Sequence, residues 1–248
     1  MNAKGDRLAP GVIFDLDGTL TDTLEDITDS INEVFWQVDH PPVSRERIRL
    51  LIGESLTNLL RQASGINDPD VLADFVDRYR HVYGKRMLNK TRLYPGVEPM
   101  LDALAESRVP MCVLSNKPHE YTAPICNALL ARWPIVRFRG CRQDDSRKPD
   151  PAVALRLATE MQRPPHHVHF VGDSSIDILT ARNAGMVPVA VTWGYRDRDD
   201  LESACPAHYV DHPVRLIELL QNHTGAEDTH TQHPRHERRS ERSRQVPG

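Results

Sequence analysis

The sequence predicts an α/β fold: a Rossmann-like parallel sheet covered by helices on both faces, with a helical cap domain inserted into it. Short β-rich runs alternate along the chain with stretches long enough for at least one helix, the pattern of parallel strands joined by helical crossovers. Between the first run and Pro95, by contrast, the chain has helical periodicity and no convincing strand. Together these observations indicate a parallel sheet that carries a separate helical insertion.

The expected strands are short runs of apolar, β-branched and aromatic residues. They are GVIFDL (11–16), PMCVLSN (110–116), IVRFRG (135–140), HVHFVGD (167–173) and VPVAVTW (187–193). Helices between them are expected at 96–107, 120–131, 151–161 and 175–184. Most of these start after proline, serine or aspartate and end at glycine or proline. A ligand site in such a fold lies at the carboxyl ends of the strands.

The inserted part has three segments with apolar residues at helical spacing. They are TLEDITDSINEVFWQV (23–38), SRERIRLLIGESLTNLLRQA (44–63) and DVLADFVDRYRHVYGKRML (70–88). An insertion directly after the first strand lies over the carboxyl edge of the sheet, where it can act as a lid. The expected division is an α/β core at 1–21 and 92–223, a helical cap at 22–91 and a disordered polar tail at 224–248.

Composition excludes several classes of partner. The formal net charge is -4, which provides no electrostatic footprint for nucleic acid or an anionic membrane. The N-terminus lacks the apolar core of a signal peptide, and no run approaches the roughly 20 apolar residues that span a bilayer. We therefore expect a cytoplasmic protein, and no oligomeric state is predicted.

Two further features have simple interpretations. The cysteines are widely spaced without a C-x-x-C pair, so we expect reduced thiols rather than a zinc site or disulfides at Cys112, Cys126, Cys141 and Cys205. The basic stretch from Arg235 to Arg244 is interpreted as a solvated tail, with contact to an acidic partner as the alternative.

Polar side chains gather at the ends of four expected strands. These are Asp15 and Asp17 in the first, Ser115 and Asn116 in the second, Lys148 after the third, and Asp173 and Asp177 after the fourth. Each one alone can be explained as a turn residue, a helix cap or a surface charge. Caps have no need of a shared edge, however, so their joint placement indicates a site.

Clustered carboxylates need a counter-charge. Two like charges about 4 Å apart cost on the order of 4 kcal/mol at an effective dielectric of about 20, and a bound cation removes that cost. A few hard oxygen ligands suit Mg²⁺, which commonly binds one or two carboxylates together with substrate phosphate oxygens. The histidines do not compete, because His166, His167 and His169 flank or alternate along a strand and cannot all face one metal.

This edge suits phosphoryl chemistry. A phosphoryl group there would meet Mg²⁺, Lys148 and the backbone N–H groups of the Gly18 turn. Asp15 is the expected nucleophile, ionised at neutral pH, and Asp17 the expected acid and base for the leaving oxygen and the water. Ser115 and Asn116 can donate to phosphoryl oxygens. For Lys117 two interpretations stay open: contact with substrate, or a solvated lysine at a strand end.

The residues also resemble the haloacid dehalogenase superfamily of phosphatases. The resemblance covers nearly all of residues 11–220 and rests on four ordered motifs: DLDGT (15–19), SN (115–116), KP (148–149) and GDSSID (172–177). It implies that Asp15 is the nucleophile and an Mg²⁺ ligand, and that Asp17 is the acid/base and binds Mg²⁺ through its backbone carbonyl. It also implies a metal-ligand role for Asp173, a ligand or supporting role for Asp177, and a C1-type cap. Gly18, Thr19, Ser115, Asn116 and Lys117 are the expected substrate-binding residues.

Within the superfamily, the longer motifs are most similar to those of phosphoglycolate phosphatases. They include SNKP (115–118), KPDP (148–151) and TWGY (192–195). The resemblance implies hydrolysis of a small phosphorylated metabolite, with 2-phosphoglycolate as the expected substrate. The chain departs from the pattern at Gly53-Glu54-Ser55, because Glu54 would repel a carboxylate substrate unless it points away. The alternatives are a phosphomutase or pyrophosphatase of the same fold and a noncatalytic binding module.

Overall fold

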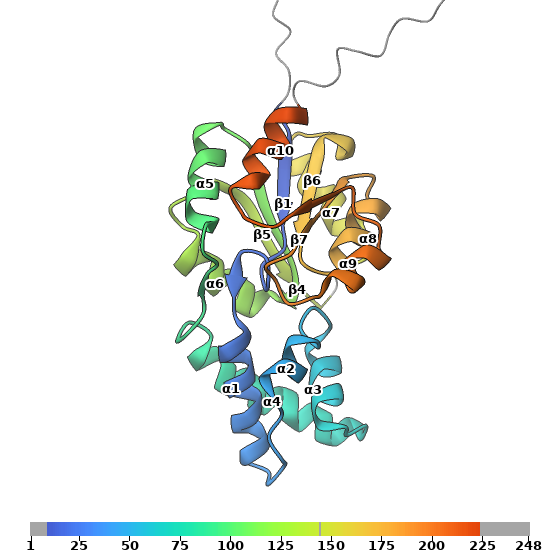
Figure 1. Ribbon diagram of the computed structural model, residues 1–248. Helices are drawn as coiled ribbons and strands as arrows, with labels where there is room; N and C mark the ends of the chain where they lie inside the picture. Colours follow the sequence, from blue (N-terminus) through green and yellow to red (C-terminus); the bar gives the residue numbers. More distant parts are fainter. Residues whose placement is uncertain (1–8, 144, 224–248) are drawn as a thin grey trace, which may run out of the picture.

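The central feature of the fold is a parallel sheet of six strands in the order β5-β4-β1-β6-β7-β8 (Figure 1). The computed structural model describes residues 9–143 and 145–223. The strands are β1 (Gly11–Phe14), β4 (Met111–Pro118), β5 (Ile135–Cys141), β6 (Val168–Gly172), β7 (Val187–Val191) and β8 (His208–Val210). Every neighbouring pair is parallel. The predicted α/β fold is therefore confirmed.

The two faces of the sheet are covered by different helices. On one face α5 (Val97–Glu106), α6 (His119–Leu129) and α10 (Arg215–His223) pack against the strands, and on the other α7 (Ala152–Glu160) and α8 (Ser175–Asn183). α9 (Arg198–Ser203) packs beside α8 and β7. A short 3₁₀ turn, Pro165–His167, precedes β6. The predicted helices match α5 to α8 closely, whereas β8, α9 and α10 were not predicted.

β1 lies in the middle of the sheet because its residues are apolar on both faces. Val12 and Phe14 belong to one apolar cluster and Ile13 to the other, and all three are buried. The register aligns Phe14 with Val113 of β4 and Val171 of β6. A strand buried on both faces reads as a continuous apolar run, which is why this one was visible in the sequence. Its position fixes where the polar residues that follow it emerge.

A helical bundle lies below the sheet in Figure 1, next to the carboxyl ends of the strands. It contains α1 (Leu24–Trp36), α2 (Arg45–Arg49), α3 (Leu56–Ser64) and α4 (Pro69–Arg86). These helices share an apolar cluster that also includes Tyr121 and Tyr195 of the α/β part. The bundle is therefore packed directly against the edge where the site was expected.

The segment with helical periodicity at 44–63 is not a single helix. The chain instead forms α2 and α3, joined by a loop. Gly53 has φ +106°, a conformation that glycine adopts without strain and that cannot continue a helix. Ser55 then caps α3 by accepting from the Asn58 N–H. Glycine and a capping serine supplied the signal for this break.

A two-stranded antiparallel ribbon connects the two parts. It pairs β2 (Thr21–Asp22) with β3 (Arg92–Leu93), close to the expected boundaries at 21/22 and 91/92. Asp26 of α1 supports the return connection, because its Oδ2 accepts from the N–H groups of Lys90 and Thr91 and from the Thr91 hydroxyl, each at 2.9 Å. Asp26 is buried, so these bonds are shielded from water.

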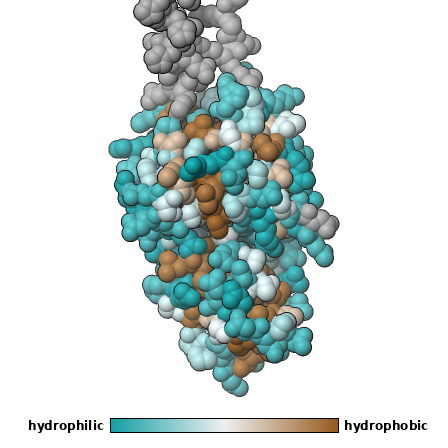
Figure 2. All heavy atoms as spheres, turned by 90° about the vertical axis from the view of Figure 1, so that its right-hand side faces the viewer, coloured by the Kyte–Doolittle hydropathy of each residue, from teal (hydrophilic) through white to brown (hydrophobic). Residues whose placement is uncertain are grey.

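The surface is mostly hydrophilic on the face shown in Figure 2, where apolar residues form separate patches. Among the described residues, no helix has the length and apolar character needed to cross a bilayer. The four cysteines are free thiols. The expected disordered tail at 224–248, with its basic stretch, lies outside the described residues.

Replacing Asp26 with alanine should destabilise the protein by about 1–3 kcal/mol, because the buried N–H of Thr91 and the part-buried N–H of Lys90 lose their acceptor. Asp29→Ala is the control: Asp29 is a partly exposed partner of Lys90, and its loss should cost less than about 1 kcal/mol. Urea unfolding measures both. Equal losses in the two variants would contradict the role assigned to Asp26.

Candidate active site

Three buried carboxylates meet at the carboxyl edge of the sheet. Asp15 follows β1 and Asp173 follows β6, while Asp177 lies in the first turn of α8. Each offers an oxygen within 4.8 Å of the others. β1 and β6 are paired neighbours, and the Asp15 N–H donates to Val171 O at 2.9 Å, so the sheet itself brings these acids together. The predicted grouping of Asp15, Asp173 and Asp177 is observed.

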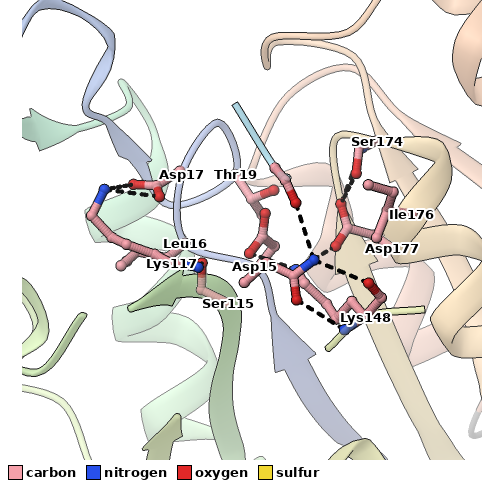
Figure 3. Close-up of polar contacts among 12 residues, drawn as sticks. Asp15, Leu16, Asp17, Thr19, Ser115, Lys117, Lys148, Ser174, Ile176 and Asp177 are labelled. Carbon is pink, nitrogen blue, oxygen red and sulfur yellow. Dashed lines mark hydrogen bonds and ion pairs between the residues drawn. The ribbon is translucent and has the colours of Figure 1, made fainter. Parts of the chain in front are cut away.

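Lys148 lies between two of these acids (Figure 3). Its Nζ donates to Asp15 Oδ1 at 2.7 Å and to Asp177 Oδ1 at 2.6 Å. Burial would lower the pKa of Lys148, but the carboxylates of Asp15 and Asp177 outweigh it and raise this pKa above its usual range. Asp177 Oδ2 also accepts from the Ser174 hydroxyl at 2.6 Å. Lys148 is therefore a charged lysine held in place at both acids.

Asp173 occupies a tight cradle. Its Oδ1 accepts from the Thr19 hydroxyl at 3.2 Å and its Oδ2 from the Tyr195 N–H at 2.7 Å. A Cβ atom at Gly18 would lie 2.3 Å from Asp173 Oδ2, and one at Gly194 would lie 2.3 Å from Asp173 Cβ. Both positions therefore require glycine for this close approach. Thr19, expected to bind substrate, contacts Asp173 here.

Three buried carboxylates share one ammonium group, and the pKa values of Asp15 and Asp173 are raised. Burial, reinforced by Asp177 and Asp173 and opposed by Lys148, raises the pKa of Asp15 to about 8. Burial, together with Asp177, raises the pKa of Asp173 to about 7. Burial thus opposes the ionised form of Asp15, and an additional positive charge beside it would favour that form.

Asp17 lies on the other side of the site, apart from the acidic group (Figure 3). A turn in which Leu16 O accepts the N–H groups of Leu20 and Thr21 follows β1 and directs the chain this way. Asp17 Oδ2 pairs with Lys117 Nζ at 3.0 Å, and its Oδ1 accepts from the Thr23 hydroxyl at 2.8 Å. The lysine is buried, so the interpretation of Lys117 as solvated was wrong.

Ser115 and Asn116 lie on β4, and their side chains make hydrogen bonds to backbone groups of the protein. The Ser115 hydroxyl accepts from the Lys117 N–H at 3.2 Å. The two amide hydrogens of Asn116 go to Gly53 O and Lys148 O, at 3.0 and 3.1 Å. Its Oδ1 accepts from the Lys148 N–H at 2.8 Å. Asn116 therefore holds the Lys148 backbone rather than offering its amide to a phosphoryl oxygen.

A cavity of about 50 Å³ lies between the acids and the bundle, room for roughly three or four waters. The core contributes Asp15, Asp17, Lys117 and Lys148 to its lining, and the bundle contributes Gly53, Glu54 and two tyrosines of α4. Lys117 Nζ lies 4.8 Å from the ring centre of one of these, Tyr83. Aromatic rings and polar groups thus surround a small space beside Asp15.

Several contributors to the site were not assigned a role from the sequence. Tyr195 joins the two sides: its N–H donates to Asp173, while its hydroxyl accepts from the Thr23 N–H at 2.8 Å. TWGY was recognised as a motif, so a signal for Tyr195 existed. Tyr83 was visible only as one apolar position in a helical pattern, which carries no functional signal.

Comparison with known proteins identifies the fold family. The family described as haloacid dehalogenase-like hydrolase matches residues 12–191, which include the acidic group and Lys148. This chain belongs to the haloacid dehalogenase-like hydrolase family. The fold also explains why Asp15, Lys148 and the acids Asp173 and Asp177 meet although they follow three different strands, β1, β5 and β6, since these parallel strands end at the same edge of the sheet.

Members of this family with curated names are similar over most of the chain. Phosphoglycolate phosphatase 1 of Pseudomonas aeruginosa is 32% identical, covering 85% of this chain and 79% of the relative. Phosphoglycolate phosphatase of Mannheimia succiniciproducens is 31% identical, covering 84% and 96%. A crystal structure of a predicted phosphoglycolate phosphatase from Haemophilus somnus has a TM-score of 0.79 at 28% identity, covering 85% and 97%.

Replacing Lys148 with methionine should destabilise the metal-free protein by about 3–5 kcal/mol, because two buried carboxylates lose their counter-charge. Adding Asp177→Asn to that variant should restore part of the loss. Arg156→Met, which breaks an exposed pair with Asp145, should cost less than about 1 kcal/mol. Denaturant unfolding in the presence of a chelator measures all three, and an unchanged Lys148→Met variant would contradict the assigned role.

Proposed function

We propose that this chain is a Mg²⁺-dependent phosphomonoesterase that hydrolyses 2-phosphoglycolate to glycolate and phosphate through an aspartyl phosphate on Asp15. The observation that carries the proposal is the position of Asp15 beside an ammonium and two further buried acids, with Asp17 two residues along the chain. The named relatives support the substrate.

The residues at the acidic group fit a small divalent cation. Three carboxylates offer oxygen ligands within 4.8 Å of one another, and one lysine leaves their negative charge in excess. Hard oxygen ligands and a site with room for water are what Mg²⁺ prefers. Asp15, Asp173 and Asp177 would hold the ion, with the Asp17 carbonyl as an additional ligand. When bound, the ion supplies positive charge for phosphoryl oxygens and keeps the carboxylates ionised.

Asp15 attacks phosphorus with the oxygen that Lys148 does not engage. Among the described contacts Lys148 takes Oδ1, which leaves Oδ2 without a donor. The new O–P bond forms as the bond from phosphorus to the glycolate oxygen breaks, and Asp17 gives that oxygen a proton. Asp17 then removes a proton from a water that attacks phosphorus, which releases phosphate and restores Asp15. Lys148 compensates charge on the phosphoryl group throughout.

The carboxylate end of the substrate contacts Lys117. This ammonium is buried, lines the cavity and faces the ring of Tyr83, whose hydroxyl has no partner among the described residues. A carboxylate that takes Lys117 frees Asp17 to reach the leaving oxygen. The Glu54 carboxylate is held toward α3, because its Oε2 accepts from the side-chain amides of Asn58 and Gln62 at 3.0 and 3.1 Å. The small cavity favours a small substrate.

Mg²⁺ should raise the melting temperature of the wild-type protein and should not raise that of Asp173→Asn, which lacks one of the proposed ligands. At a concentration 100 times the dissociation constant the expected stabilisation is about 2.7 kcal/mol. Glu202→Gln, at an exposed acid of α9, serves as the control and should respond like wild type. A full magnesium shift in Asp173→Asn would contradict the ligand assignment.

The function is tested by ranking kcat/KM over 2-phosphoglycolate, sugar phosphates, nucleotides and pyrophosphate. We expect 2-phosphoglycolate to rank first, Asp15→Asn to lower the rate by on the order of 10³-fold or more, and Asp17→Asn to lower it by roughly 10²- to 10⁴-fold. Brief reaction with ³²P-labelled substrate should label wild type and not Asp15→Asn. Isomerised sugar phosphate without free phosphate would indicate a mutase, and no turnover of any substrate a binding module.

A further inference from the structure

Two core side chains reach across to one loop of the bundle. The loop connects α2 to α3 and presents the carbonyl groups of Leu50, Ile52 and Gly53 to the core. Arg196, in the connection between β7 and α9, donates to Leu50 O and, at 2.9 Å, to Ile52 O. Asn116 of β4 donates to Gly53 O at 3.0 Å. All three acceptors are backbone atoms of a single turn.

The guanidinium group of Arg196 donates its hydrogen bonds to this loop. It has no carboxylate partner among the described residues, so its guanidinium donors are directed at these carbonyls. Leu50 ends α2, where the last carbonyls of a helix lack an N–H partner within the helix. A charged donor satisfies them with bonds stronger than those between neutral groups.

Asn116 connects the same loop to the catalytic lysine. Its side chain clamps both backbone polar groups of Lys148, accepting from the N–H and donating to the carbonyl, and its remaining amide hydrogen goes to Gly53. The amide group is planar, so these three bonds share one orientation of the side chain. A change in the position of Gly53 therefore changes the hold on Lys148.

Gly53 gives the loop the shape that this contact needs. Its φ of +106° is a conformation that side-chain-bearing residues rarely adopt, while a Cβ placed there would meet no atom within 4 Å. Sterically the position could hold a larger residue, but the backbone conformation favours glycine. The requirement therefore comes from the direction of the chain and of the carbonyl that Asn116 uses.

We propose that Asn116 and Arg196 form a latch that holds the bundle closed over the cavity and couples closure to the placement of Lys148. Both are positioning residues. Arg196 stabilises the closed position of the loop. Asn116 also stabilises it and, when the loop is closed, holds the Lys148 backbone in place. Each bond of the latch shifts the ratio of closed to open forms by roughly 2- to 12-fold. The kinetic consequences rest on the proposed function, whereas the closure itself does not.

The first test measures amide hydrogen exchange in the loop, residues 50–55, without substrate. Arg196→Ala should exchange there about fivefold or more faster than wild type, because the bonds to Leu50 O and Ile52 O are lost. Arg198→Ala is the matched control, since Arg198 is exposed and pairs with Glu202. Wild-type exchange in Arg196→Ala would overturn the latch and leave the proposed phosphatase standing.

The second test uses kinetics with 2-phosphoglycolate to distinguish stabilisation of the closed loop from the effect of closure on Lys148. Arg196→Ala should raise KM about fivefold and change kcat little, because closure becomes less favourable while the site stays intact. Asn116→Asp keeps the acceptor for the Lys148 N–H and loses both donors, so it should raise KM and also lower kcat by about tenfold. Gly53→Ala should resemble Asn116→Asp, raising KM and lowering kcat, because a side chain at this φ shifts the carbonyl that Asn116 binds. A wild-type kcat in Asn116→Asp would overturn the coupling.

Discussion

The contact of Lys148 with Asp15 and Asp177 determines how the rest of this site is built. Buried carboxylates repel one another unless a positive charge lies among them, and Lys148 supplies that charge at 2.7 and 2.6 Å. Its own position depends on Asn116, which clamps its backbone, and on Ser174, which holds Asp177. The ion pair is thus placed by β4 and by the first turn of α8, two elements far apart in the chain.

The sheet and the bundle contribute different kinds of chemistry. The sheet edge provides fixed charge, because neighbouring parallel strands end side by side and their side chains are buried there. The bundle contributes apolar and aromatic surface together with the Gly53 loop, and it restricts the cavity to about 50 Å³. A low-dielectric lid over fixed charges strengthens every electrostatic interaction beneath it. Two tyrosines of the core, Tyr121 and Tyr195, extend into the bundle's apolar cluster and join the two parts.

Asp15 and Asp17 belong to one motif, but their carboxylates have different partners. Asp15 points toward Lys148 and the acidic group, whereas Asp17 points toward Lys117 and Thr23. The tight turn after β1 separates them. Asp15 therefore lies with Lys148 and the two other acids, and Asp17 lies with Lys117 on the other side of the site. This division follows from backbone geometry rather than from residue type.

The sequence by itself determined the parallel sheet, the helical insertion and the acids at the strand ends. These features are local, since a doubly buried strand is a continuous apolar run and parallel strands necessarily end at one edge. Only the tertiary structure decided that Asn116 clamps Lys148, that Lys117 is buried against Asp17, and that Arg196 reaches Leu50 and Ile52. Each of these contacts joins residues more than 30 positions apart or crosses between core and bundle. Their partners depend on how rigid elements pack, which no local pattern of residues encodes.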